Sequence, residues 1–167
     1  MNKRNIILIG MPGAGKSSVG VILAKVLGYE FIDTDLVIQH REKRLLREII
    51  ADEGNEGFLA IENEVNATLE ADKSVIAPGG SAIYGKEAME HFKEIGTIVY
   101  LKLSYEDLAK RLGNLKGRGV VLKEGQTLKD LYDERSKLYE QYAEITVDES
   151  GRDIQGTILV LREQIGM

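Results

Sequence analysis

The chain has 167 residues, 43% hydrophobic and 29% charged, which fits one domain with a full core. Its net charge of −5 argues against nucleic acid or an anionic membrane as a partner, and no apolar run approaches the ~20 residues of a membrane span. The absence of cysteine excludes disulfides and thiolate sites, and the N-terminus has no signal pattern, so we expect a cytoplasmic protein.

A phosphate-binding loop is the first feature along the chain. The motif Gly-x-x-x-x-Gly-Lys-Ser spans Gly10–Ser17, between a predicted buried strand over 5–9 and a predicted helix over 16–27. Its glycines let the backbone turn N–H groups toward a phosphate, at the positive end of the following helix. We expect the nucleotide to contact Gly13, Ala14, Gly15, Lys16, Ser17 and Ser18. Lys16 can reach the β- and γ-phosphates, and the Ser17 hydroxyl can ligate Mg2+.

Two carboxylates follow a second predicted strand over 30–32. Asp33 and Asp35 come at its carboxyl end, the edge at which open α/β sheets bind ligands. One could hold the magnesium shell and the other could face an acceptor hydroxyl. The alternative is that Asp35 only caps a helix that begins at Leu36.

The segment 36–69 has a helical pattern, interrupted near 54–57. Most of its acidic side chains are expected on solvated helix faces. The series Arg41, Arg44 and Arg47 is expected to be a surface stripe, with a role in binding a substrate anion kept open. The two histidines, His40 and His91, are also interpreted as surface residues.

Three further strands are predicted over 74–77, 97–101 and 145–147, with helices over 86–94, 105–112, 127–142 and 153–164. Gly79 and Gly80 follow the third strand and allow a ligand to approach the backbone, or form a simple tight turn. Ser104 is a candidate helix cap. Residues 113–126 form a glycine-punctuated basic stretch, which we interpret as a mobile lid that brings Arg118 to the transferring phosphoryl group. The alternation predicts a three-layer α/β sandwich with a five-stranded, mainly parallel sheet, in a single domain over 1–167.

These motifs in this order resemble the shikimate kinase family, within the nucleoside-monophosphate-kinase-like group of phosphate-loop folds. The resemblance is carried by the segments Phe-Ile-Asp-Thr-Asp at 31–35 and Glu-Arg-Ser-Lys-Leu-Tyr at 134–139. It implies the strand order 2-3-1-4-5. It also implies these site residues: Asp33 in the magnesium shell, Asp35 on the acceptor hydroxyls, Gly79 and Gly80 beside the acceptor, Arg135 on its carboxylate, Arg118 in the lid, and Arg111 near adenine.

Three positions depart from the family pattern. Leu59 stands where the family has an arginine that grips the shikimate carboxylate, and Ser81 replaces the third glycine of a Gly-Gly-Gly run. The lid has Arg-Gly-Val-Val at 118–121, where Arg-Pro-Leu-Leu is common. The nucleotide half of the site therefore matches more closely than the acceptor half.

The resemblance implies an ATP- and Mg2+-dependent kinase that phosphorylates shikimate to shikimate 3-phosphate, in the pathway to chorismate and the aromatic amino acids. Lys16, Asp35 and Arg118 are the expected catalytic residues. The expected partner is a small-molecule acceptor, with no nucleic acid and no membrane, for a monomer. Leu59 keeps open a kinase for another small hydroxy acid or sugar. A nucleotide-binding module without transfer activity is the other alternative.

Overall fold

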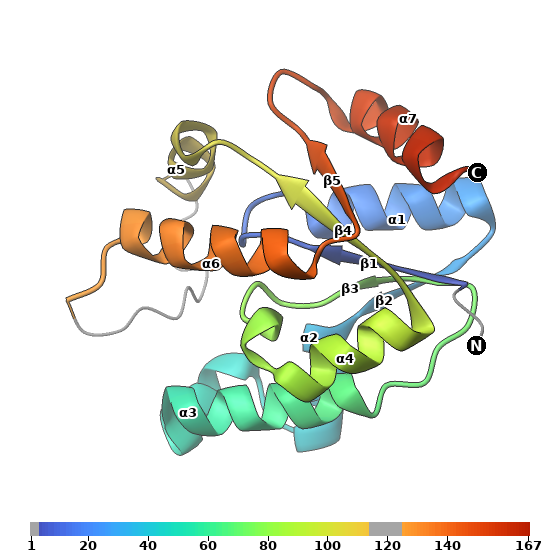
Figure 1. Ribbon diagram of the computed structural model, residues 1–167. Coiled ribbons are helices and arrows are strands. Elements are labelled where there is room, and N and C mark those ends of the chain that lie inside the picture. The colour runs from blue at the N-terminus through green and yellow to red at the C-terminus, as the bar shows by residue number, and fades with distance from the viewer. Residues whose placement is uncertain (1–3, 114–124) are drawn as a thin grey trace.

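The computed structural model describes residues 4–113 and 125–167. A five-stranded sheet in the order β2-β3-β1-β4-β5, with every strand pair parallel, forms the centre of the domain, and helices cover both faces (Figure 1). The predicted fold class and strand order are confirmed. The elements in chain order are β1 (Asn5–Ile9), α1 (Lys16–Leu27), β2 (Glu30–Asp33), α2 (Thr34–Glu42), α3 (Leu46–Ala67), β3 (Ser74–Ala77), the 3-10 turn η1 (Ala82–Tyr84), α4 (Lys86–Ile95), β4 (Gly96–Lys102), α5 (Tyr105–Gly113), α6 (Leu128–Tyr142), β5 (Ile145–Asp148) and α7 (Ile154–Ile165).

Each central strand is apolar on both faces because helices cover both sides of the sheet. In β1, Ile6 and Leu8 pack in a cluster with α1 and α7, while Ile7 and Ile9 pack in a second cluster with α4, α5 and α6. A third, smaller cluster joins α2 to α3 through Ile38, Ile49, Phe58 and Val65. The sheet is thus held rigidly on both sides, and its carboxyl edge presents the loops that form the site.

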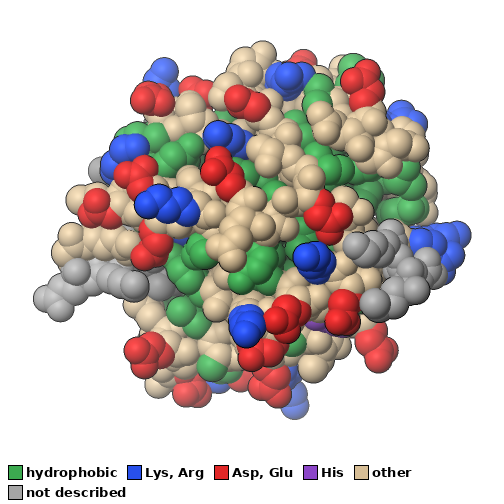
Figure 2. Space-filling model, viewed as in Figure 1, with side chains coloured by type: hydrophobic (Ala, Val, Ile, Leu, Met, Phe, Trp, Pro, Cys, Tyr) green, Lys and Arg blue, Asp and Glu red, His purple; other side chains and the backbone are tan. Residues whose placement is uncertain are grey.

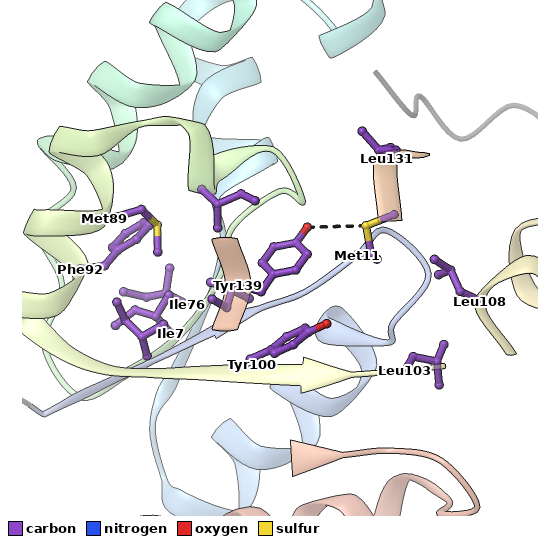
Figure 3. Packing of buried hydrophobic residues seen from close by; sticks show 13 residues of the cluster. Ile7, Met11, Ile76, Met89, Phe92, Tyr100, Leu103, Leu108, Leu131 and Tyr139 are labelled. Atoms are coloured by element: carbon purple, nitrogen blue, oxygen red, sulfur yellow. Dashed lines mark hydrogen bonds between the residues drawn. The ribbon is translucent and has the colours of Figure 1, made fainter. Parts of the chain in front are cut away.

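Tyr139 connects this core to the loop after β3. Its ring lies among the buried side chains and stacks at a tilt on Tyr100, with ring centroids 5.1 Å apart (Figure 3). Its hydroxyl group donates a hydrogen bond to the carbonyl oxygen of Gly80 at 2.7 Å and lies 3.9 Å from the sulfur of Met11. The fully buried ring therefore fixes α6 against the two loops that line the site.

The region after β2 differs from the prediction at one point and agrees with it at another. The structure has two helices where one interrupted helical segment was predicted, because α2 ends at Lys43 in the left-handed conformation (φ 55°). The segment 43–45 contains neither glycine nor proline, so the sequence gives no sign of this break. The predicted interruption near 54–57 is confirmed, since Gly54 has non-helical angles (φ 75°, ψ 176°) inside α3.

Acidic and basic side chains are interspersed over the face of the molecule shown in Figure 2. His40 is exposed as predicted, but His91 is half-buried and its ring nitrogen lies 2.6 Å from the carbonyl oxygen of Leu69. Within the described residues, no helix is long and apolar enough to cross a membrane.

Candidate active site

A cavity of about 660 Å³ lies where the loops after β1, β2 and β3 meet. Parallel strands place their carboxyl ends at one edge of a sheet, which is why segments far apart in sequence converge there. Its walls come from the phosphate loop, the start of α2, both halves of α3, the loop after β3, and α6. The lining residues are Pro12, Gly13, Gly15, Lys16, Ser17, Ser18, Asp33, Asp35, Leu46, Arg47, Ile50, Phe58, Glu62, Ala77, Pro78, Gly79, Gly80, Ser81 and Arg135.

The phosphate loop has the backbone conformation that an anion site requires. Gly13 and Gly15 have positive φ angles of 89° and 81°, which side chains other than glycine rarely adopt. Gly15 is also the N-cap of α1, and no side chain caps the helix. The first-turn N–H groups therefore face the cavity without an intrahelical partner, which suits a phosphate group.

Lys16 is only 9% exposed, and its ammonium group donates hydrogen bonds to the carbonyl oxygens of Gly10 at 2.7 Å and Met11 at 2.9 Å. These bonds satisfy a buried cation through the loop's own backbone. Phosphate oxygens would compete for the same donors. Ala14, which was also predicted to contact the nucleotide, is buried and does not line the cavity.

Asp33 and Asp35 both line the cavity, but the capping role belongs to Asp33. Helix α2 begins at Thr34 rather than Leu36, and the Asp33 carboxylate accepts a hydrogen bond from the backbone N–H of Asp35 at 2.9 Å. The alternative in which Asp35 caps the helix is therefore wrong. Burial raises the pKa of Asp35 to about 6, the charge of Asp33 acts in the same direction, and Lys16 opposes both.

The residues present suit a magnesium ion that is shared with a nucleotide. The Ser17 hydroxyl and the Asp33 carboxylate line the same cavity. Within 4–113 and 125–167, no group of three or more histidine, aspartate or glutamate side chains is clustered for a metal. Mg2+ is usually bound through one or two protein oxygens together with water and substrate phosphates, so this donor set fits it.

Gly79 and Gly80 lie where side chains crowd the cavity wall. A Cβ atom on Gly79 would lie 2.9 Å from an oxygen of Asp35 and 3.1 Å from an oxygen of Glu62. A Cβ atom on Gly80 would lie 2.7 Å from Pro12 and 2.9 Å from a guanidinium nitrogen of Arg135. These glycines therefore do more than form a tight turn, because they leave room for four side chains that line the cavity.

Arg135 lies almost fully inside the protein, with 2% of its surface exposed. Its guanidinium group lies over the ring of Tyr84, 5.5 Å from the centroid, and the Tyr84 hydroxyl group donates a hydrogen bond to Glu134. Its Nε has no hydrogen-bond partner among the described residues. A buried cation that lines a cavity with an unused donor is suited to binding an anionic group of a ligand.

Glu62 is an exception to the expectation that most acidic side chains of 36–69 lie on solvated helix faces. The side chain is 1% exposed, lines the cavity, and accepts a hydrogen bond from the Ser81 hydroxyl at 2.7 Å. Burial raises its pKa to about 7, the Ser81 hydrogen bond and Arg135 oppose this, and the charge of Asp35 adds to it. The available signal was its spacing of four residues from Phe58, which places both on the buried face of α3.

Arg111 and Glu149 lie beside the phosphate loop. Arg111 donates a hydrogen bond to the carbonyl oxygen of Gly13 at 3.0 Å, although it does not line the cavity. Burial raises the pKa of Glu149 to about 7, against the opposing charges of Arg111 and Lys16. The sequence analysis did not identify Glu149. Arg118 and most of the predicted lid over 113–126 lie outside the described residues, so both stay predictions.

The three arginines Arg41, Arg44 and Arg47 lie in different environments. Arg41 pairs with Glu64 at 3.1 Å, and Arg44 pairs with Glu42, Asp52 and Glu53, as expected for a surface stripe. Arg47 lines the cavity instead. Leu59, at the position of the family's arginine, does not line it, although Phe58 and Glu62 on the same helix do.

Comparisons with known proteins agree with this geometry. A family model described as shikimate kinase matches residues 12–165. Shikimate kinase 2 of Yersinia enterocolitica is 34% identical over 154 residues, which covers 87% of this chain and 86% of that protein. A shikimate kinase from Acinetobacter baumannii, solved in complex with shikimate, superimposes with a TM-score of 0.83 at 32% identity, covering 97% of this chain and 93% of that one. The shikimate kinase of Aquifex aeolicus gives a TM-score of 0.78 at 28% identity, covering 97% and 96%.

Proposed function

The chain belongs to the shikimate kinase family, and from this we propose that it transfers the γ-phosphoryl group of ATP to a hydroxyl of shikimate, giving shikimate 3-phosphate. One observation supports this above the others. A phosphate loop with Lys16, the carboxylate of Asp35 and a buried arginine, Arg135, all line one cavity. A site that bound only a nucleotide would not need Asp35 and Arg135 on the same cavity.

The nucleotide half of the proposal rests on the phosphate loop. The backbone N–H groups of Gly13 to Ser17 would hold the β-phosphate, and Lys16 would exchange its backbone partners for phosphate oxygens. Ser17 and Asp33 would hold Mg2+. When bound, ATP supplies the phosphoryl group and Mg2+ neutralises charge on its phosphate oxygens.

The acceptor half rests on Asp35 and Arg135. Asp35 would orient the acceptor hydroxyl and take its proton as the new oxygen–phosphorus bond forms and the bond to the leaving ADP oxygen breaks. With a pKa of about 6, the carboxyl of Asp35 is largely ionised at pH 7.5 and can accept that proton. Arg135 would hold the acceptor carboxylate. Gly79 and Gly80, which have no side chain, would let the ring of shikimate approach the wall of the cavity. We also propose that the protein acts as a monomer on a small-molecule acceptor, since both walls of the cavity come from one chain. The proposed location is the cytoplasm.

Product identification tests the proposal directly. The purified chain is incubated with ATP, Mg2+ and shikimate, and ADP formation is measured together with mass spectrometry of the phosphorylated product. Gluconate and homoserine are run in parallel. We expect saturable turnover with shikimate; turnover of another acceptor with none of shikimate would refute it.

The variant Lys16→Ala tests the role of the phosphate loop in the proposed transfer. We expect kcat to fall by at least ~100-fold, because a cation at the transferring phosphate contributes several kcal/mol to transition-state stabilisation. Circular dichroism and thermal unfolding should show that the variant remains folded. Near-normal turnover by a folded Lys16→Ala variant would contradict the kinase mechanism.

A further inference from the structure

The acceptor side of the cavity carries two acidic side chains, Asp35 and Glu62, which disfavour a carboxylate ligand. Arg135 provides one compensating cation from α6. The first turn of α3 provides a second, Arg47, which faces the same cavity. A planar carboxylate has two oxygens, and two guanidinium groups can bind it from different walls.

Arg47 is exposed to solvent at the cavity, and its environment differs from that of its neighbours. Its neighbours Arg41 and Arg44 are engaged in ion pairs with acidic side chains. Arg47 has no hydrogen bond or ion pair from its side chain to any residue in 4–113 or 125–167. A cation in the first turn is also unfavourable with the helix dipole, whose positive end lies there. A ligand carboxylate would satisfy both the donors and the dipole.

The break in α3 puts both halves of the helix on the cavity. Leu46, Arg47 and Ile50 line it from before Gly54, and Phe58 and Glu62 line it from after. Glu62 accepts a hydrogen bond from the Ser81 hydroxyl at 2.7 Å, which gives one of its oxygens a partner without an arginine at position 59. Arg47 and Ser81 therefore line the same cavity, whereas Leu59, in the second half of α3, does not.

We propose that Arg47 is a specificity-determining residue that binds the acceptor carboxylate together with Arg135. The inference rests on the proposed function, since it assigns this carboxylate to the acceptor of that reaction. Arg47 thus supplies the guanidinium that Leu59 does not, from one helical segment earlier in the chain.

The test compares Arg47→Ala with Arg41→Ala, which removes the same charge from a neighbouring exposed site outside the cavity. Both variants and the unaltered chain are assayed with shikimate and with its methyl ester, which keeps the hydroxyls and lacks the negative charge. We expect Arg47→Ala to lower kcat/KM for shikimate by about 10- to 100-fold, the range of charge-assisted hydrogen bonds. Its kcat/KM for the ester and its KM for ATP should stay within about 3-fold of the unaltered chain, as should every constant of Arg41→Ala.

The outcomes separate clearly. An Arg47→Ala variant that treats shikimate as Arg41→Ala does would overturn the inference and leave the proposed function intact. An equal loss with shikimate and with the ester would show a purely structural role and would also overturn it. Absence of shikimate turnover by the unaltered chain refutes the proposed function, and the inference with it. Arg47→Lys, which keeps the charge, should recover part of the discrimination between acid and ester.

Discussion

Glu62→Gln should make the folded state more stable, and increasingly so as the pH rises. The carboxyl of Glu62 is buried within reach of the charges of Asp35 and Arg135, and among the described residues the Ser81 hydroxyl is its one hydrogen-bond partner. Its second oxygen has no partner among the described residues. Glutamine has the shape and donor pattern of the protonated acid, so the variant removes the ionised form while keeping the accepted hydrogen bond.

The size of the effect follows from the pKa. Burial raises the pKa of Glu62 from 4.5 to about 7, so the folded state binds more protons than the unfolded state between these values. The stability of the unaltered chain therefore falls as the pH rises through this window. At ~1.36 kcal/mol for each pKa unit, the folded state loses about 3 kcal/mol once Glu62 is ionised.

Urea unfolding at intervals from pH 5 to pH 8 measures the difference in unfolding free energy between the variant and the unaltered chain. We expect the advantage of Glu62→Gln to grow from about 1 kcal/mol at pH 5 to about 3 kcal/mol at pH 8. Glu56→Gln, on the exposed face of α3, is the matched control for the loss of one carboxylate. A difference that stays constant across this range, or that favours the unaltered chain as the pH rises, would refute the reasoning.

Two further substitutions test the acceptor wall. Gly80→Ala should raise KM for shikimate by ~10-fold or more and change KM for ATP little, because the added methyl group would lie 2.7 Å from Pro12 and 2.9 Å from Arg135. Steady-state kinetics with each substrate varied in turn checks this, and an equal rise in both constants would contradict it. Asp35→Asn should lower kcat by ~100-fold or more at pH 8, where Asp35 is ionised, because the amide cannot accept the hydroxyl proton. Retention of most of the turnover at that pH would show that Asp35 is not the base.

The sequence predicted the sheet well because the strands are buried on both faces. Runs such as Ile6 to Ile9 can form only a central strand once a phosphate loop follows them. The break between α2 and α3 was not predictable, since Lys43 adopts a left-handed conformation that the sequence around it does not favour. After the break, α2 and α3 pack against each other through a small apolar cluster.

The site residues were predictable where a sequence motif fixes the backbone. They were less predictable where tertiary contacts determine which side chains line the cavity. The phosphate loop and the Asp-Thr-Asp segment lie on the cavity as their spacing predicts. Glu62 and Arg47 lie in a region rich in charged side chains, where composition alone suggests a solvated surface. Glu62 is buried, against this expectation, whereas Arg47 is exposed in agreement with it and also lines the cavity.

The two walls of the cavity have separate origins in the chain, and this bears on how such an enzyme can evolve. The nucleotide wall is built from the loop between β1 and α1, whereas α3, the loop after β3 and α6 build the acceptor wall. A mutation on α3 can therefore change which acceptor is preferred while the machinery that handles the triphosphate remains intact. The arginine that is missing at Leu59, in the second half of α3, can thus be replaced by Arg47 in the first half, so that the acceptor is held from a different part of the same helix.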